Sequence, residues 1–214
     1  MKNKLTRSAG KRTNNIAADC SFPVYFFPQQ AVNYCNNKKI EEFFNAVGVK
    51  VRKRIPIGSG LGGGSSNAAT FLMMANSELK LGLSSAELAR IGCPVGADVS
   101  FFTSGLSSAN VSGIGEIVEE FHDDIPEIKL IMPDISCSTV GVYKKFRESF
   151  YKEADKKEIE ELRGKTSKEL LLTLSPMYAN DLYEPALSLY PELFKHGGED
   201  IFFSGSGSTF FKVV

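Results

Sequence analysis

The chain has 214 residues, of which 43% are hydrophobic and 23% are charged. This composition is typical of a globular protein that buries a core of its own. The 25 basic residues balance the 25 acidic ones, so no overall positive field attracts nucleic acid or an anionic membrane. No apolar run approaches the roughly 20 residues that span a bilayer, and the start lacks the layout of a signal peptide. We therefore expect a cytoplasmic protein that holds its substrate with local groups.

The N-terminal region carries little pattern. Residues 1–30 are polar or interrupted by prolines and predict one strand at most. Residues 39–46 then predict a short amphipathic helix that ends near Gly48. Partial alternation of apolar and polar residues over residues 49–55 predicts a strand with one buried face.

A glycine-rich loop follows this strand and precedes a helix. Residues 56–67 contain five glycines and three serines, and apolar residues at helical spacing from Ala68 to Leu79 predict the helix. A helix start reached through glycines offers free backbone N–H groups and the positive end of a dipole to an anion. The loop therefore predicts a phosphate cradle, for which the candidate residues are Pro56, Ile57, Gly58, Ser59, Gly60, Leu61, Gly62, Gly63, Gly64, Ser65 and Ser66.

Three other interpretations of the loop fit less well. Gly58, Gly60 and Gly63 match the Gly-x-Gly-x-x-Gly of dinucleotide-binding folds, and Glu78 stands at the expected distance for the acid. Glu78 falls inside the predicted helix, however, and the preceding strand is too charged for a buried parallel strand. The Walker A pattern fails because Gly64 stands where lysine is required. A flexible linker is disfavoured because both flanks are strongly patterned.

A single carboxylate stands out after the next helix. Ser84 and Glu87 form a capping-box pattern that opens this helix, and Asp98 then lies between a Gly-Ala step and the apolar residues 99–102, which we interpret as a strand. A lone Asp in a turn is ordinarily an Asx-turn or a helix cap. Near a phosphate cradle it can instead accept the proton of an attacking hydroxyl, as in kinases. Asp98 is therefore the candidate catalytic residue.

The second half repeats the alternation of strands and helices. Its predicted elements are two strands around a glycine turn at residues 109–118, a strand at 128–133, exterior helices over 142–163 and another helix that opens at 175–182 and continues to His196. An acidic connector, residues 119–124, precedes the strand at 128–133, so we predict two domains, residues 1–124 and 125–214. In the helices Phe146, Phe150 and Tyr151 are expected to face the core.

A second loop of small residues lies between two aromatic strands near the end of the chain. It contains Gly205, Ser206, Gly207 and Ser208. As a hairpin turn it needs no function, but two Gly/Ser loops in one chain suit a protein that holds phosphates from two sides. These four residues are therefore candidate substrate-binding residues.

The cysteines and histidines predict no metal site. Cys20, Cys35, Cys93 and Cys137 are isolated in the sequence, and no His stands at metal-ligand spacing from them. We expect free thiols in a reducing compartment. His122 and His196 lack the context of a catalytic triad and are expected to be ordinary surface residues.

These segments together resemble the motifs of the GHMP kinases, the family of homoserine, mevalonate and galactose kinases. Residues 56–69 resemble the nucleotide loop of the family, and residues 204–211 resemble its third motif. Residues 96–102 resemble a Gly-Ala-Asp-Val-Pro-Phe-Phe signature, with Ser100 in place of Pro, and residues 180–185 resemble an Asn-Asp-Leu-x-x-Pro region. The resemblance covers roughly residues 29–214.

The resemblance implies an α+β, two-domain GHMP-kinase fold and an ATP-dependent reaction with Mg²⁺. The wording of the motifs implies phosphorylation of the 2-hydroxyl of 4-diphosphocytidyl-2-C-methyl-D-erythritol in the non-mevalonate isoprenoid route, with Asp98 as the base and no nucleic-acid or membrane partner. It leaves a homodimer open. The Lys-x-Asn and Gly-Tyr-His motifs that open the family are not found, so we expect the N-terminal strands to be partly missing. Two alternatives therefore stay open, a GHMP kinase for another small alcohol and a non-catalytic nucleotide-binding fragment.

Overall fold

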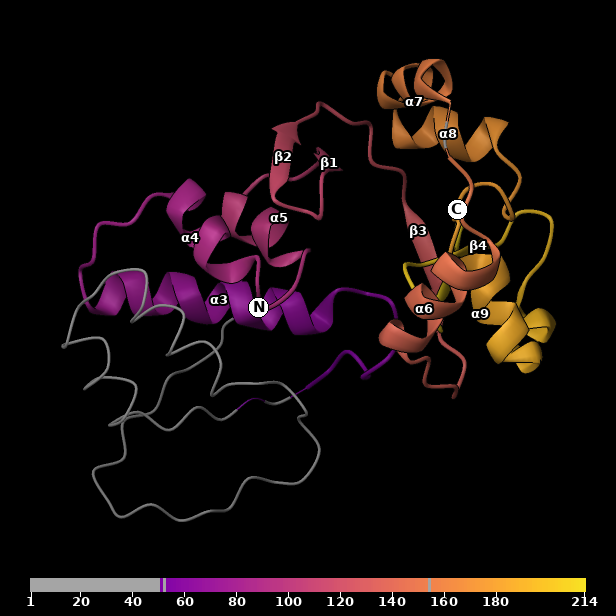
Figure 1. The fold of residues 1–214 in the computed structure, drawn as a ribbon, viewed down its shortest axis with the longest axis horizontal. Coiled ribbons are helices and arrows are strands. Elements are labelled where there is room, and N and C mark those ends of the chain that lie inside the picture. The colour runs from indigo at the N-terminus through magenta and orange to yellow at the C-terminus, as the bar shows by residue number, and fades with distance from the viewer. Residues whose placement is uncertain (1–50, 52, 154) are drawn as a thin grey trace, which may run out of the picture. The chain divides into compact units, whose positions relative to one another are not determined.

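Figure 1 shows the computed structural model, which describes residue 51, residues 53–153 and residues 155–214. The described residues fall into two compact units. The first includes Gly64–Ser107 and Val111–Glu119, and the second includes Ile55–Gly63, Ser108–Asn110 and Glu120–Val214. The division into domains at residues 1–124 and 125–214 stays a prediction. No helix in the described part of the chain is long and apolar enough to cross a membrane.

The expectations for the N-terminal region fall largely outside the described residues. These are the single early strand, the helix at residues 39–46, the missing opening strands, and Cys20 and Cys35. The prediction of a strand over residues 49–55 is wrong for the described residues of this segment, because Val51 and residues 53–55 have no strand conformation. Val51 is 39% exposed, so the alternation there does not mark a buried face.

The described part of the first unit contains three helices that share one core. They are α3 (Gly63–Glu78), α4 (Ser85–Gly92) and α5 (Val99–Ser104) (Figure 1). The core consists of Ala68, Ala69, Leu72, Leu88, Ile91 and Val99. The small side chains of α3 recur at helical spacing and let the other helices approach closely. Gly92 serves the same purpose, because a Cβ added there would lie 2.3 Å from the Cγ1 of Val99.

The apolar run after Asp98 is a helix and not the strand that we predicted. Thr103 donates its hydroxyl to the carbonyls of Val99 and Ser100, each at 3.0 Å, and Gly105 ends the helix in the left-handed conformation with φ 75°. Short apolar runs do not distinguish a strand from a buried helix by their period. Here the only side that must be buried is that of Val99, Ser100 and Thr103, which one helical turn brings together.

The strands predicted around the glycine turn are confirmed. β1 (Ala109–Ser112) and β2 (Ile117–Glu120) form a two-stranded sheet. The turn between them contains Gly113 and Gly115, both with positive φ. Because only glycine adopts this conformation without strain, the sequence signal for a turn was sound.

The second unit contains a three-stranded antiparallel sheet in the order β3-β5-β4. Its strands are β3 (Ile128–Ile131), β4 (Phe202–Phe203) and β5 (Phe210–Val213). Its helices are α6 (Thr139–Ser149), α7 (Lys156–Arg163), α8 (Ser167–Thr173), α9 (Tyr183–Leu189) and the 3₁₀ helix η1 (Pro191–His196). The strand and exterior helices expected in this half are therefore present, and the α+β class is confirmed.

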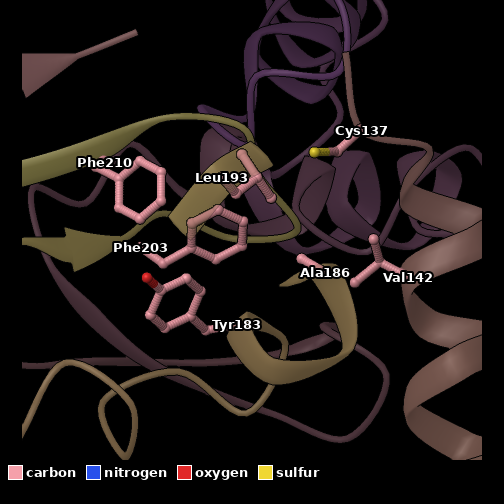
Figure 2. Close-up of a cluster of buried hydrophobic side chains, with 7 residues drawn as sticks. All are labelled: Cys137, Val142, Tyr183, Ala186, Leu193, Phe203 and Phe210. Carbon is pink, nitrogen blue, oxygen red and sulfur yellow. The ribbon is translucent and has the colours of Figure 1, made fainter. Parts of the chain in front are cut away.

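One core cluster joins this sheet to α6, α9 and η1. Figure 2 shows its members, Cys137, Val142, Tyr183, Ala186, Leu193, Phe203 and Phe210. The ring of Tyr183 stacks on Phe203 at 4.9 Å between centroids, and Phe210 meets Phe203 edge-on at 5.0 Å. Such offset and edge-on pairs stabilise a core beyond the area that they bury.

Two expectations in this unit need correction. The helix predicted from residue 175 begins only at Tyr183, because the side chain of Asn180 accepts a hydrogen bond from the N–H of Leu182 at 2.9 Å and holds the chain in a turn. Tyr151 is 66% exposed and does not face the core. It packs instead edge-on against the ring of Phe146, which is partly buried, as is Phe150.

The capping box of α4 gives a first testable prediction. Ser84 accepts from the N–H of Glu87, and the Glu87 carboxylate accepts from the N–H of Ser84 at 2.8 Å. Replacing Ser84 with Ala removes the cap and should lower Tm by about 2–4 °C at neutral pH. Ser85→Ala is the matched control because Ser85 is exposed and does not cap the helix. An equal loss of Tm in both variants, measured by thermal melting, would contradict the assignment.

The same capping box should make this stability dependent on pH. The backbone N–H and the hydroxyl of Ser84 hold the pKa of Glu87 below its ordinary value. Because the folded-state pKa is the lower one, the contribution is complete above the ordinary glutamate pKa and is lost as the pH falls through the folded value. The difference in Tm between the wild type and Ser84→Ala should therefore shrink in acid.

Candidate active site

The first part of the glycine loop is fixed within the second unit through its carbonyl groups. The carbonyl of Gly58 accepts from the N–H groups of Ser208 at 3.0 Å and Cys137 at 3.2 Å, and the carbonyl of Ser59 accepts from the N–H of Thr209 at 3.1 Å. The predicted nucleotide loop and the second Gly/Ser loop, far apart in sequence, are thus bonded to each other. Their association was expected, but the direct backbone pairing was not.

Gly60 lies at the closest approach of the two loops. The hydroxyl of Ser204 donates to the carbonyl of Gly60 at 2.9 Å. A Cβ added to Gly60 would stand 2.1 Å from the carbonyl oxygen of Ser204, and one added to Gly205 would stand 2.9 Å from the carbonyl oxygen of Gly60. No residue with a side chain fits either position without moving backbone.

The glycines of the loop alternate with residues of ordinary backbone conformation. Gly58, Gly60 and Gly62 have φ of 68°, 71° and 61°, and neither Ser59 nor Leu61 has a positive φ. Left-handed residues that alternate with right-handed ones turn successive backbone N–H groups toward one side, which is how anion-binding concavities are built. The carbonyls are used to anchor the loop, whereas no hydrogen bond within the described residues takes up the N–H groups of Gly60, Leu61 or Gly62. The loop can therefore donate to an anion.

The start of α3 continues this pattern in the first unit. Its first turn contains no acidic residue, so nothing there competes with an anion for the helix N-terminus. Ser65 and Ser66 are partly buried. The hydroxyl of Thr70 donates to the carbonyl of Ser66 at 2.8 Å, which ties the first turn of α3 to the next.

The turn that carries Asp98 is held against this helix start. A Cβ added to Gly96 would lie 3.4 Å from the Oγ of Ser65, and one added to Gly115 would lie 2.7 Å from the Cβ and the carbonyl oxygen of Ala97. Val99, which follows Asp98, is fully buried in the core of the three helices. The turn is thus fixed from three directions.

Asp98 itself is exposed at the N-cap position of α5, but it is not a cap. Its side chain forms no capping hydrogen bond. The structural alternative that we gave for this residue, an Asx-turn or cap, therefore lacks its hydrogen bond. A rigid turn that displays a carboxylate without a capping hydrogen bond can serve as a base.

The candidate residues of the second Gly/Ser loop are mostly buried. Gly205 is exposed, whereas Ser206, Gly207 and Ser208 are buried. The hydroxyls of Ser206 and Thr139 form a hydrogen bond at 3.0 Å, and Ser208 donates its hydroxyl to the carbonyl of Ile135. Pro56 and Ile57, at the entrance of the first loop, are exposed. In this arrangement the buried serines contact protein, and Gly205 is the member of the set that remains open to a ligand.

Two groups of residues at the site were missed from sequence. Residues 136–139 follow β3 and contribute contacts to both loops, and Asn180 donates to the carbonyls of Phe203 and Gly205 at 3.0 and 2.9 Å. The run of small polar residues after a strand was a signal for the first group. Asn180 was noted for its motif, but nothing local in the sequence indicates what it bonds.

The described residues contain no group of three or more His, Cys, Asp or Glu side chains that could hold a metal ion. His122 is exposed, and His196 lies beside the ring of Phe210 at 6.5 Å between centroids. Cys93 and Cys137 are free thiols.

Cys137 gives a second testable prediction. Burial raises the pKa of its thiol to about 11, with a smaller effect from the negative charge of Glu192. Because the thiolate is the reactive form, iodoacetamide near neutral pH should label Cys137 much more slowly than the partly buried Cys93 in the folded protein, as measured by peptide mass spectrometry. In the unfolded chain the two rates should become similar. Equal rates in the folded protein would show that the thiol next to Gly58 is accessible.

Comparison with known proteins adds an independent finding. Residues 27–106 match the family model of the GHMP kinases N terminal domain. A 4-diphosphocytidyl-2-C-methyl-D-erythritol kinase of Sulfurimonas denitrificans is 52% identical over 81% of this chain and 65% of its own length. One of Campylobacter jejuni subsp. doylei is 44% identical over 83% of this chain and 70% of its own length. The chain thus spans about two thirds of the length of these relatives.

A solved structure is also similar. The crystal structure of a 4-(cytidine 5'-diphospho)-2C-methyl-D-erythritol kinase superposes with a TM-score of 0.63 and 27% sequence identity, covering 92% of this chain and 70% of that one. The likeness extends over nearly all of this chain.

Proposed function

The chain belongs to the GHMP kinase family, and from this premise we propose that it transfers the γ-phosphoryl group of ATP to the 2-hydroxyl of 4-diphosphocytidyl-2-C-methyl-D-erythritol. Its curated relatives carry the name of this kinase, and they share about half of its residues over four fifths of the chain. The proposal places the reaction in the cytoplasm, with a small molecule as the only partner. A homodimer is compatible with it.

One observation carries the proposal. Gly96 lies against Ser65, which places the turn of an unpaired carboxylate beside the N-terminus of the helix that follows the glycine loop. A kinase needs these two features close together, a group of N–H donors for the phosphates and a base for the attacking hydroxyl. The proximity supports Asp98 as the base and Ser65 and Ser66 as part of the phosphate site.

In the proposed reaction the backbone N–H groups of residues 60–66 bind the β- and γ-phosphates, and the dipole of α3 offsets their charge. Asp98 accepts the proton of the 2-hydroxyl as its oxygen attacks the γ-phosphorus. The bond from the γ-phosphorus to the bridging oxygen breaks, and ADP leaves with that electron pair. Gly205, Ser206, Gly207 and Ser208 are proposed as substrate-binding residues, as their motif implies.

The residues present are compatible with Mg²⁺ held chiefly by ATP. Ser65 and Ser66 are the hydroxyl ligands that the loop offers, since the described residues lack a cluster of acidic ligands. A bound ion would supply positive charge that offsets part of the negative charge of the phosphates. The chain itself contributes positioning, through a loop whose carbonyls are already bonded to protein.

The proposal is tested by measuring ADP release from ATP with and without 4-diphosphocytidyl-2-C-methyl-D-erythritol, alongside binding of a fluorescent ATP analogue. Release that depends on this acceptor is the expected result. Release with homoserine or mevalonate instead would assign the chain to another alcohol. Binding of the ATP analogue without turnover of any acceptor would identify the chain as a non-catalytic nucleotide-binding protein. Absence of binding would overturn the proposal altogether.

A further inference from the structure

Asn180 forms three hydrogen bonds with its side-chain amide. The Nδ2 group donates to the carbonyl of Phe203 at 3.0 Å and to the carbonyl of Gly205 at 2.9 Å. The Oδ1 atom accepts from the N–H of Leu182 at 2.9 Å. The two carbonyls belong to the residues on either side of Ser204, so Asn180 holds this residue between two fixed points.

The segment that Asn180 holds is the one that contacts the nucleotide loop. The hydroxyl of Ser204 donates to the carbonyl of Gly60 at 2.9 Å. The Cα of Gly60 lies 3.4 Å from the point where a Cβ of Gly205 would stand. A continuous set of contacts therefore runs from Asn180 through Ser204 and Gly205 to Gly60.

The contacts require an amide in particular. Two carbonyl oxygens need donors and one N–H group needs an acceptor, and asparagine supplies both from a short side chain. Aspartate has the same shape but only accepts, so its oxygen would face two carbonyl oxygens. Leaving buried or half-buried polar groups unpaired is costly, whereas a satisfied network makes a segment rigid.

We propose that Asn180 is a positioning residue for nucleotide binding, which fixes the geometry of the loop at Gly60 through Ser204 and Gly205. This inference rests on the proposed function, because it assumes that the loop around Gly60 binds ATP. Asn180 lies in the turn before α9, outside both Gly/Ser loops. The inference gives this turn a role at the nucleotide site.

The test is Asn180→Asp in the 214-residue chain. The dissociation constant of a fluorescent ATP analogue should rise about tenfold or more, and KM for ATP should rise more than kcat falls. Amide hydrogen exchange should become faster in peptides that contain residues 58–62 and 205–208. A residue that only stabilises the fold would not change exchange in these two loops selectively.

Asn110→Asp is the matched control. Asn110 lies in the same unit and donates its amide to the carbonyl of Arg163 at 3.2 Å, so the chemical change is identical and the acceptor is not part of either loop. We expect this variant to leave the affinity for the ATP analogue unchanged. If both variants lose similar stability and keep wild-type affinity, Asn180 is structural only and the inference is overturned.

A second variant keeps the inference testable if Asn180→Asp does not fold. Ser204→Ala removes only the hydroxyl that reaches Gly60, and it should weaken binding of the ATP analogue several-fold. In combination with Asn180→Asp the effects should be less than additive, because both act on the same contact. Unchanged affinity in Ser204→Ala would overturn the inference. Absence of nucleotide binding by the wild type would instead overturn the proposed function and, with it, this role.

Discussion

Replacing Asp98 with Asn should lower kcat by about 10²–10⁴-fold, the range that a general base contributes, while the affinity for ATP stays within about twofold. The reason is that Asp98 is exposed and forms no capping hydrogen bond, so its carboxylate does not contribute to the fold. Exposed substitutions of this kind change stability by about 0.5 kcal/mol or less. The measurements are steady-state ADP release with the cytidyl substrate, binding of a fluorescent ATP analogue, and Tm.

The result separates a base from a residue that merely shapes the turn. Asp124→Asn serves as the control because Asp124 is also an exposed carboxylate, in the acidic connector that we interpret as surface. It should leave kcat, KM and Tm unchanged. If Asp98→Asn turns over at the wild-type rate, or if its loss of kcat is accompanied by a clear loss of Tm, the catalytic assignment of Asp98 is wrong.

The glycine loop could be predicted from sequence because its structure depends on positions that only glycine fills without strain. Gly58, Gly60 and Gly62 all have positive φ, and a segment with this many obligatory glycines between patterned flanks is visible in the sequence itself. The turn at Gly113 and Gly115 was predicted for the same reason. A local backbone conformation of this kind can be predicted from the identity of single residues.

The elements around Asp98 and Asn180 could not be predicted with the same success. The motif gave Asp98 as a candidate, yet the residues after it form α5 instead of a strand, because a run of four residues, three of them apolar, is too short to define its own period. The delayed start of α9 depends on one side-chain hydrogen bond, from Leu182 to Asn180. Neither the helical conformation after Asp98 nor the hydrogen bond to Asn180 changes the hydrophobic pattern from which the elements were predicted.

The contacts that build the site are also invisible to any local pattern. Ser204 and Gly60, which form the central hydrogen bond between the two loops, are 144 residues apart in the chain. Both segments are rich in small residues, and each resembles a motif of the GHMP kinases. Only the structure shows that the carbonyls of Gly58, Ser59 and Gly60 are consumed in joining them, which leaves the N–H groups for a ligand.

Replacing Gly60 with Ala should have the largest effect on nucleotide binding, with the dissociation constant of the ATP analogue rising about a hundredfold or more. Two effects add. An L-residue at φ 71° is strained by about 1–2 kcal/mol, and the new Cβ would stand 2.1 Å from the carbonyl oxygen of Ser204. That oxygen belongs to backbone and cannot move away as a flexible side chain would, so the two loops must separate. Binding is measured by fluorescence titration and stability by urea denaturation.

Comparison with Gly82→Ala separates the two effects. Gly82 has φ 69°, nearly the same as Gly60, but a Cβ added there meets nothing within 4 Å. It should therefore carry the conformational strain alone, lose about 1–2 kcal/mol of unfolding free energy, and bind the ATP analogue as the wild type does. The difference between the two variants then measures what the close approach of the loops contributes. The new methyl group should displace the loop at Gly60, and a displaced loop cannot keep its N–H groups in place for the phosphates. If Gly60→Ala nevertheless binds the analogue as well as Gly82→Ala does, the contact between Gly60 and Ser204 does not shape the nucleotide site.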